Sequence, residues 1–194
     1  YVAATESQVW LVNLASGERR QLLPAAGETL RAAHFAGDFL PDNRRLLVAS
    51  DRAGEFRESM VLDIQTGQLQ RLTADVAWDV SDGALSRDGR WQALQFNVNG
   101  KDELRLLDVA AGFKPRPLPG LPAGSIGSMA FRPGADELAF TVNSAQGPSQ
   151  VFTVDVASGQ VAQWTRAHAP PGVDMAQFSD QRIVTWPSFD GRTI

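Results

Sequence analysis

A nine-residue pattern recurs four times along the chain. Each copy reads as a β-strand that ends in a tight turn, with Asp or Asn four residues before a Gly. The four copies span residues 9–17, 59–67, 104–112 and 151–159. Their glycines lie 50, 45 and 47 residues apart, and a near-constant period in this range is typical of a repeat architecture.

The apolar residues favour strands throughout the chain. Alternating or short apolar runs recur, and no stretch of about 12 residues carries a 3.6-residue apolar period. Each unit contains four strand patterns, a to d, which matches a β-propeller blade. Because one sheet cannot bury both of its faces alone, such blades must stack on neighbours. The sequence therefore predicts an all-β fold of stacked four-stranded antiparallel blades.

The positions of the turns predict one incomplete and three complete blades. The first unit lacks a strand a, and its three strands are expected at 1–4, 9–14 and 19–22. We predict blade segments at 1–23, 30–73, 80–118 and 125–165, a linker at 166–181, and a separate strand and turn at 182–194. Since few blades leave open end faces, we expect an open arc of a larger propeller, with more blades upstream.

Composition excludes several classes of protein. The chain has 194 residues and a net charge of −4, which disfavours a nucleic-acid partner. It has no cysteine, so disulfides and thiolate metal sites are excluded. No apolar run is long enough to span a membrane. The chain begins at Tyr1 without a leader, so we expect a piece of a longer protein or a processed one, and the compartment stays open.

Catalytic motifs are missing from the sequence. There is no G-x-S-x-G, H-E-x-x-H, calcium loop or phosphate-binding glycine loop. Of the two histidines, we interpret His34 as packed or channel-lining and His168 as a solvated linker residue. The recurring acidic residues are interpreted as turn caps, and the tryptophans as packing between blades. These are Asp63, Asp108 and Asp155, and Trp10, Trp78, Trp91, Trp164 and Trp186.

The C-terminal residues Ser188-Phe189-Asp190-Gly191-Arg192-Thr193-Ile194, following a run of blades, carry a resemblance to a known family. They resemble the junction between propeller and α/β-hydrolase domain in the prolyl-oligopeptidase family of serine peptidases. The turns at 41–42, 86–89 and 132–134 look like the S-P-D-G turns of this family, which TolB-like propellers share. The resemblance implies that 182–194 opens a hydrolase domain, that the parent protein hydrolyses short peptides without a metal or organic cofactor, and that the propeller acts as a gate and size filter.

Loops between strands b and c, together with the linkers between blades, are expected on one rim, beside a hydrolase domain. In the resembled family, charged propeller side chains can hold a peptide terminus. The charged loop 51–58 supplies the candidates Arg52, Glu55, Arg57 and Glu58, since Arg can bind a carboxylate and Glu an amine. The alternative is that these charged side chains belong to a solvated surface loop without a role in binding. Lesser candidates are Asn97, Asn99 and Lys101.

Two other functions stay open at this point. A non-catalytic TolB-like propeller would bind a partner peptide as a protein-interaction module. A lactonase-like propeller enzyme would need metal ligands facing the channel, and the sequence shows no such cluster.

Overall fold

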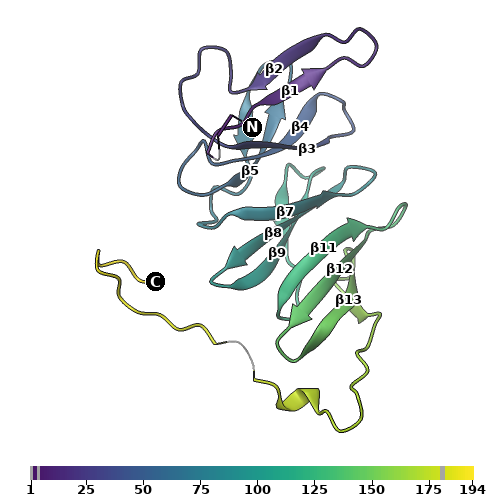
Figure 1. Cartoon of the computed structure of the whole chain (residues 1–194). Coiled ribbons are helices and arrows are strands. Elements are labelled where there is room, and N and C mark those ends of the chain that lie inside the picture. The colour runs from purple at the N-terminus through teal and green to yellow at the C-terminus, as the bar shows by residue number, and fades with distance from the viewer. Residues whose placement is uncertain (1, 4, 180–181) are drawn as a thin grey trace.

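The computed structural model describes residues 2–3, 5–179 and 182–194, and these residues are almost entirely β. They form one two-stranded and three four-stranded antiparallel sheets. The sheets stack in chain order into an arc, and the first and last sheets lie at opposite ends of it (Figure 1). The predicted all-β fold, with one incomplete and three complete blades in an open arc, is confirmed.

Each complete blade places its four strands in sequence order from the inner to the outer edge. Blade 1 contains β1 (Val9–Val12) and β2 (Arg19–Leu23); blade 2 contains β3 (His34–Phe39), β4 (Arg45–Ser50), β5 (Glu58–Asp63) and β6 (Leu69–Arg71). Blade 3 contains β7 (Val80–Leu85), β8 (Trp91–Val98), β9 (Lys101–Asp108) and β10 (Lys114–Arg116). Blade 4 contains β11 (Ser125–Phe131), β12 (Glu137–Ser144), β13 (Gly147–Asp155) and β14 (Val161–Gln163).

Among the described residues, blade 1 has two strands where the sequence predicted three. Tyr1 and Ala4 lie outside the described residues, and Ala3 and Glu6 form only an isolated bridge. The next segment turns toward blade 2 instead, because the Ser7 hydroxyl donates to the His34 carbonyl and accepts from the His34 N–H at 2.7 and 2.6 Å.

The recurring Asp and Asn residues cap the turn between strands c and d. In blade 2, the Asp63 carboxylate accepts hydrogen bonds from the N–H groups of Gln65 and Thr66 at 2.9 and 3.1 Å. Gly67 then adopts a φ of 76°, which L side chains rarely adopt. The corresponding residues accept equivalent backbone bonds in the other blades: Asn13, Asp108 and Asp155. The structural interpretation of these residues is confirmed.

The core lies between blades, not within them. Successive side chains of a strand point to opposite faces, so one sheet contributes to two interfaces. In blade 2, Leu46 and Met60 pack toward blade 1, whereas Leu47 and Val61 pack toward blade 3. The interface between blades 3 and 4 is built around the fully buried Trp91 and its neighbours.

An arginine on the outer strand ties two of the three blade boundaries at their outer edge. Arg20 of β2 donates to the Ile64 carbonyl in blade 2 at 2.9 Å. Arg116 of β10 donates to the carbonyls of Val156 and Ala157 in blade 4 at 2.8 and 2.6 Å. We refer to these contacts as the outer clasps.

The five tryptophans differ in burial, so the prediction that all of them pack between blades is wrong. Trp91 is 2% exposed, but Trp10, Trp164 and Trp186 are 50%, 66% and 55% exposed. Trp10 alternates with core residues of β1 and so lies on the outer face of blade 1. Trp164 donates to Thr153 on the outer face of blade 4 at 3.0 Å. Within the described residues, no blade covers these faces. Trp78 is half-buried and contacts Phe56 in the loops.

The segment after β14 leaves the blades as an extended chain with one short 3-10 helix, Met175–Gln177 (Figure 1). At its end, Trp186 and Ile194 exchange backbone hydrogen bonds at 3.0 and 2.9 Å, and Pro187 pairs with Thr193. Of the strand and turn expected at 182–194, the structure shows the turn, closed by a single isolated bridge, and assigns no strand to the described residues there. No helix among the described residues is long and apolar enough to cross a membrane.

Candidate functional site

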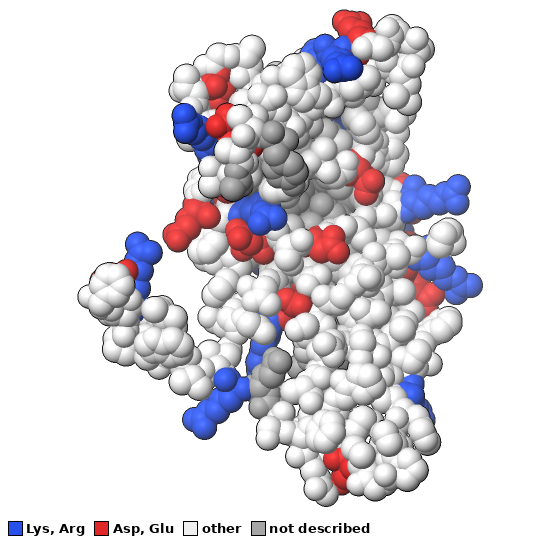
Figure 2. Space-filling view, in the orientation of Figure 1, with Lys and Arg blue, Asp and Glu red and all other residues white. Residues whose placement is uncertain are grey.

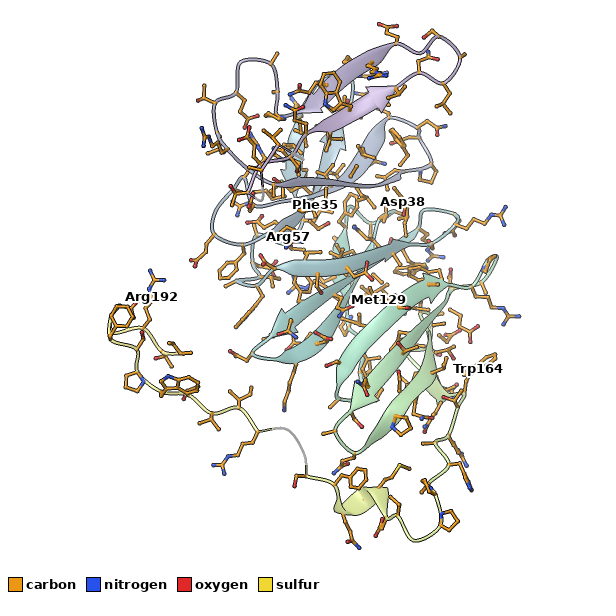
Figure 3. All side chains as sticks on the ribbon, viewed as in Figure 1. Phe35, Asp38, Arg57, Met129, Trp164 and Arg192 are labelled. Carbon is orange, nitrogen blue, oxygen red and sulfur yellow. The ribbon has the colours of Figure 1, made fainter. Side chains whose placement is uncertain are left out.

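The charged loop 51–58 lies on the same rim as the linker between blades 2 and 3. The Asp79 carboxylate in that linker accepts from the Arg57 N–H at 2.6 Å, and Asp79 lies 3.9 Å from the Arg57 guanidinium. The Arg57 guanidinium also stacks over the Phe35 ring, 4.9 Å from its centroid. Phe35 and Arg57 thus meet where blades 2 and 3 adjoin (Figure 3).

Arg52 points toward the linker between blades 1 and 2. Its guanidinium forms an ion pair with Glu28, while the buried Arg52 Nε has no partner. Burial opposes ionisation of Glu28, yet the pKa of this carboxyl is lowered, because hydrogen bonds from Arg52 and the Ala25 N–H outweigh burial. Arg52 is therefore engaged with its own scaffold.

Glu58 is buried and serves its own sheet. Arg71 of β6 pairs with both Glu58 carboxylate oxygens, and the Nε to Oε2 distance is 2.7 Å. Glu55 is exposed at the tip of the loop. Of the four predicted candidates, only Arg57 lines a cavity between blades; Arg52 and Glu58 face scaffold partners.

The cavity that Arg57 lines has a volume of about 280 Å³ and lies between the inner strands β3 and β7. Its apolar wall includes Leu47 and Leu94, and its polar wall includes Asp38, Asp82 and Gln92. Figure 2 shows acidic side chains gathered around a basic one across the middle of this face, where β3 and β7 lie in Figure 1. Sequence reasoning missed Asp38, Asp82 and Gln92, since it placed function on loops.

The lesser candidates shape the hairpin between β8 and β9. The Asn97 side chain donates to Asp102 at 2.8 Å and accepts from the Gly100 N–H at 3.0 Å. Val98 pairs with Lys101, so Asn99 and Gly100 form the two-residue turn that the sequence predicted.

The two histidines contribute no catalytic arrangement. His34 is 4% exposed, and its Nδ1 lies 2.8 Å from the buried Ser50 hydroxyl. His168 is exposed in the C-terminal segment. Within the described part of the chain, no group of three or more His, Cys, Asp and Glu side chains could hold a metal ion.

Stability is expected to fall at mildly acidic pH because of His34. Burial is the main cause that lowers the pKa of His34; the charge of Arg52 lowers this pKa further, whereas the charges of Glu28 and Asp51 oppose the shift. The unfolded state therefore binds the proton more readily, and stability present above about pH 6.5 is lost as the pH falls below that value. Melting curves between pH 8 and 5 should show a weaker pH dependence for His34→Gln than for wild type. The exposed His168→Gln is the control, and identical pH dependence in wild type and His34→Gln would contradict the expectation.

The fold is that of a β-propeller segment, and the cavity between blades 2 and 3, which Arg57 lines, is its candidate site. Among solved structures, the chain is similar to a prolyl endopeptidase, with a TM-score of 0.78 and 15% identity over 97% of this chain and 27% of that one. A puromycin hydrolase matches with a TM-score of 0.69 and 22% identity over 91% of this chain and 26% of that one. TolB from Acinetobacter baumannii matches with a TM-score of 0.60 and 15% identity, over 89% and 47%.

At these identities the likeness shows the propeller fold, and the resemblance expected from sequence is confirmed at that level. The chain spans about a quarter of the length of the prolyl endopeptidase and the puromycin hydrolase. No protein-family model and no curated protein matches the sequence.

Proposed function

We propose that the chain is the later part of the β-propeller of a serine peptidase, followed by the first hairpin of its α/β-hydrolase domain. In this proposal residues 1–165 are propeller, 166–181 are linker and 182–194 open the hydrolase domain. The supporting observation is the extent of the structural match. The last blade strand ends at Gln163, so a match over 97% of the chain must include most of the segment that follows.

The proposed role of the propeller is to admit short peptides and exclude folded proteins. The exposed residues of β3, β7 and β11 form the inner edges of the stacked blades, which would line the passage in a complete ring. Small side chains predominate there, as a passage for an extended peptide requires. The serine, histidine and acidic residues of catalysis would lie in the hydrolase domain.

The test uses the full-length protein that contains this chain. We expect a fluorophosphonate probe to label one serine, and we expect cleavage of unstructured peptides of about ten residues but not of a folded protein. The matched control is the same folded protein after denaturation and fragmentation into short peptides. Absence of both labelling and peptide cleavage would contradict the peptidase, and equal cleavage of the folded protein would contradict the gate.

The second candidate is a non-catalytic interaction module, which the TolB match favours because it covers 47% of the TolB chain. This second function would be supported if the full-length protein shows no hydrolase activity and its propeller binds and retains a partner peptide.

A further inference from the structure

The cavity between blades 2 and 3 lies where the inner strand β7 carries Gly83, at the pairing position that Met129 occupies in β11. The turns that follow β3, β7 and β11 begin at Leu40, Ser86 and Arg132, which donate equivalent backbone hydrogen bonds to Arg45, Trp91 and Glu137. By strand pairing, Gly83, opposite Leu94, corresponds to Met129, opposite Phe140. Gly37 lies in a bulge of β3. Met129 packs into the core between blades 3 and 4, whereas Gly83 leaves the corresponding space between blades 2 and 3 open.

Two carboxylates line this space without a cation to balance them. Asp38 and Asp82 are both exposed on the inner strands. The Asp82 carboxylate accepts one hydrogen bond, from the Gly83 N–H at 2.8 Å. Neither lies within ion-pair distance of Lys or Arg in the described part of the chain.

These carboxylates are specific to this boundary. Asp38 lies in a bulge of β3 opposite Leu47, and the residues that pair at that position in β7 and β11 are Ala84 and Ala130. At the pairing position of Asp82, β3 and β11 carry Phe35 and Gly127. The blade framework therefore does not require an acidic residue at either position.

The third lining charge, Arg57, already has partners. Its guanidinium stacks on Phe35 and faces the Asp79 carboxylate. With Arg57 and Asp79 compensating each other, the two aspartates leave the cavity with a net negative charge. Figure 3 shows Phe35, Arg57 and Asp38 along the boundary between β3 and β7.

A buried amide oxygen on the cavity wall also lacks a hydrogen-bond partner. Gln92 of β8 is 4% exposed, and its Nε2 donates to the Ser59 hydroxyl across the blade boundary at 3.3 Å. Its Oε1 is buried and has no hydrogen-bond partner. Such an unpaired acceptor is costly, and a donor from a ligand would relieve the cost.

We propose that this cavity is a subsite for an organic cation carried by a peptide, either a guanidinium or ammonium side chain or an α-ammonium group. Asp38 and Asp82 would attract the charge at the mouth, Phe35 would supply an aromatic face, and Gln92 would accept a hydrogen bond after a small side-chain adjustment. A volume of about 280 Å³ is at the lower end for a small-molecule site, so it suits one side chain. The inference rests on the proposed function only in taking a peptide as the carrier.

The test measures binding directly by calorimetry in the full-length protein, with hydrolysis blocked by prior reaction with a fluorophosphonate. Three C-terminally amidated peptides serve as probes: Ac-Gly-Arg-Gly-NH2, Ac-Gly-citrulline-Gly-NH2, and Gly-citrulline-Gly-NH2, which has a free N-terminus. The first carries only a guanidinium and the third only an α-ammonium group, while the second is neutral and nearly isosteric with the first. The peptide that binds identifies the source of the cation.

Small side chains at exposed positions make matched changes at low risk to folding. Asp38→Ala copies Ala84, and Asp82→Ser removes the carboxylate but keeps a small polar side chain. Each is expected to weaken binding of the cationic peptide about fivefold, the effect of losing one exposed charge pair. Gly83→Met copies Met129 and is expected to abolish binding by filling the space. The fold should tolerate this change, because the atoms nearest to the added Cβ are the flexible end of Leu94 at 3.2 Å and the Ala93 carbonyl oxygen at 3.4 Å. Glu18→Gln, an exposed change on blade 1, is the control.

The subsite would be supported if a cationic peptide binds the wild type and three further results hold. Binding is lost in Gly83→Met, is weaker in both aspartate variants, and is weakened by added salt. Equal binding of cationic and neutral peptides, or unchanged binding in Gly83→Met with a normal melting temperature, would overturn it. Preference for a carboxylate peptide, abolished by Arg57→Gln, would also overturn it. Because binding is measured without turnover, a negative result here leaves the peptidase proposal standing, and absent hydrolysis leaves the binding result standing.

Discussion

Replacing Trp91 by alanine is expected to destabilise the protein by about 3–5 kcal/mol, the range for truncating a large buried aromatic side chain. Trp91 is 2% exposed and forms the centre of the interface between blades 3 and 4. Arg90 and Arg116 both stack on its ring, at 4.8 and 5.6 Å from the ring to the guanidinium carbon. Each arginine also reaches blade 4, Arg90 through Asp136 and Arg116 through backbone carbonyls. Loss of the indole therefore removes packing and the surface that orients two inter-blade contacts.

Urea unfolding followed by circular dichroism would measure this effect. Trp91→Phe should cost much less than Trp91→Ala, because the indole Nε1 has no hydrogen-bond partner to lose. Trp10→Ala is the matched control, since Trp10 is 50% exposed and should cost under about 1 kcal/mol. Similar losses for Trp91→Ala and Trp10→Ala would show that the core is not concentrated between the blades.

Gly89→Ala is expected to cost about 3 kcal/mol, of which about 1 comes from the left-handed backbone and about 2 from overpacking. Gly89 has a φ of 70°, and an added Cβ would lie 2.2 and 2.3 Å from Cγ and Cδ of Pro41. Pro41 belongs to the turn of blade 2 and Gly89 to the turn of blade 3. Because the proline ring is rigid, the clash must push the two blades apart.

Gly134→Ala separates the two costs. Gly134 lies in the corresponding turn of blade 4 with a φ of 77°, but an added Cβ there meets nothing within 4 Å. This variant should lose only the backbone part, about 1 kcal/mol. The difference between the two variants, measured by urea unfolding, reports the contact between Pro41 and Gly89. Equal losses would mean that the blades move apart here at no cost.

Sequence periodicity was sufficient to predict the blades and their turns. The alternation of apolar residues and the fixed position of Asp63 before Gly67 are local signals, and local hydrogen bonds satisfy them. The roles of the tryptophans were partly wrong because burial depends on whether another sheet covers the face. Trp10 and Trp91 carry the same local strand signal, yet only Trp91 is covered on the described arc.

The candidate site was predictable only in part, for a different reason. Charge alone selected Arg52, Arg57 and Glu58, but partners remote in sequence decide which of them is available. Arg52 forms an ion pair with Glu28, and Glu58 forms an ion pair with Arg71. The cavity depends on which side chains face each other across a boundary, and comparing Gly83 with Met129 in the aligned repeats would have revealed it.

The outer clasps give the arc an uneven stiffness along its outer edge. Gln70 occupies the position in β6 that Arg20 and Arg116 occupy in β2 and β10, and its side chain makes no hydrogen bond among the described residues. The boundary between blades 2 and 3 thus lacks a clasp at its outer edge, while the Pro41 and Gly89 turns touch at one end of the same boundary. We therefore expect blades 2 and 3 to tilt relative to each other more easily than the other neighbouring blades, with the contact between Pro41 and Gly89 as the fixed point. Such a tilt would change the width of the space beside Asp38 and Asp82 without unfolding either sheet.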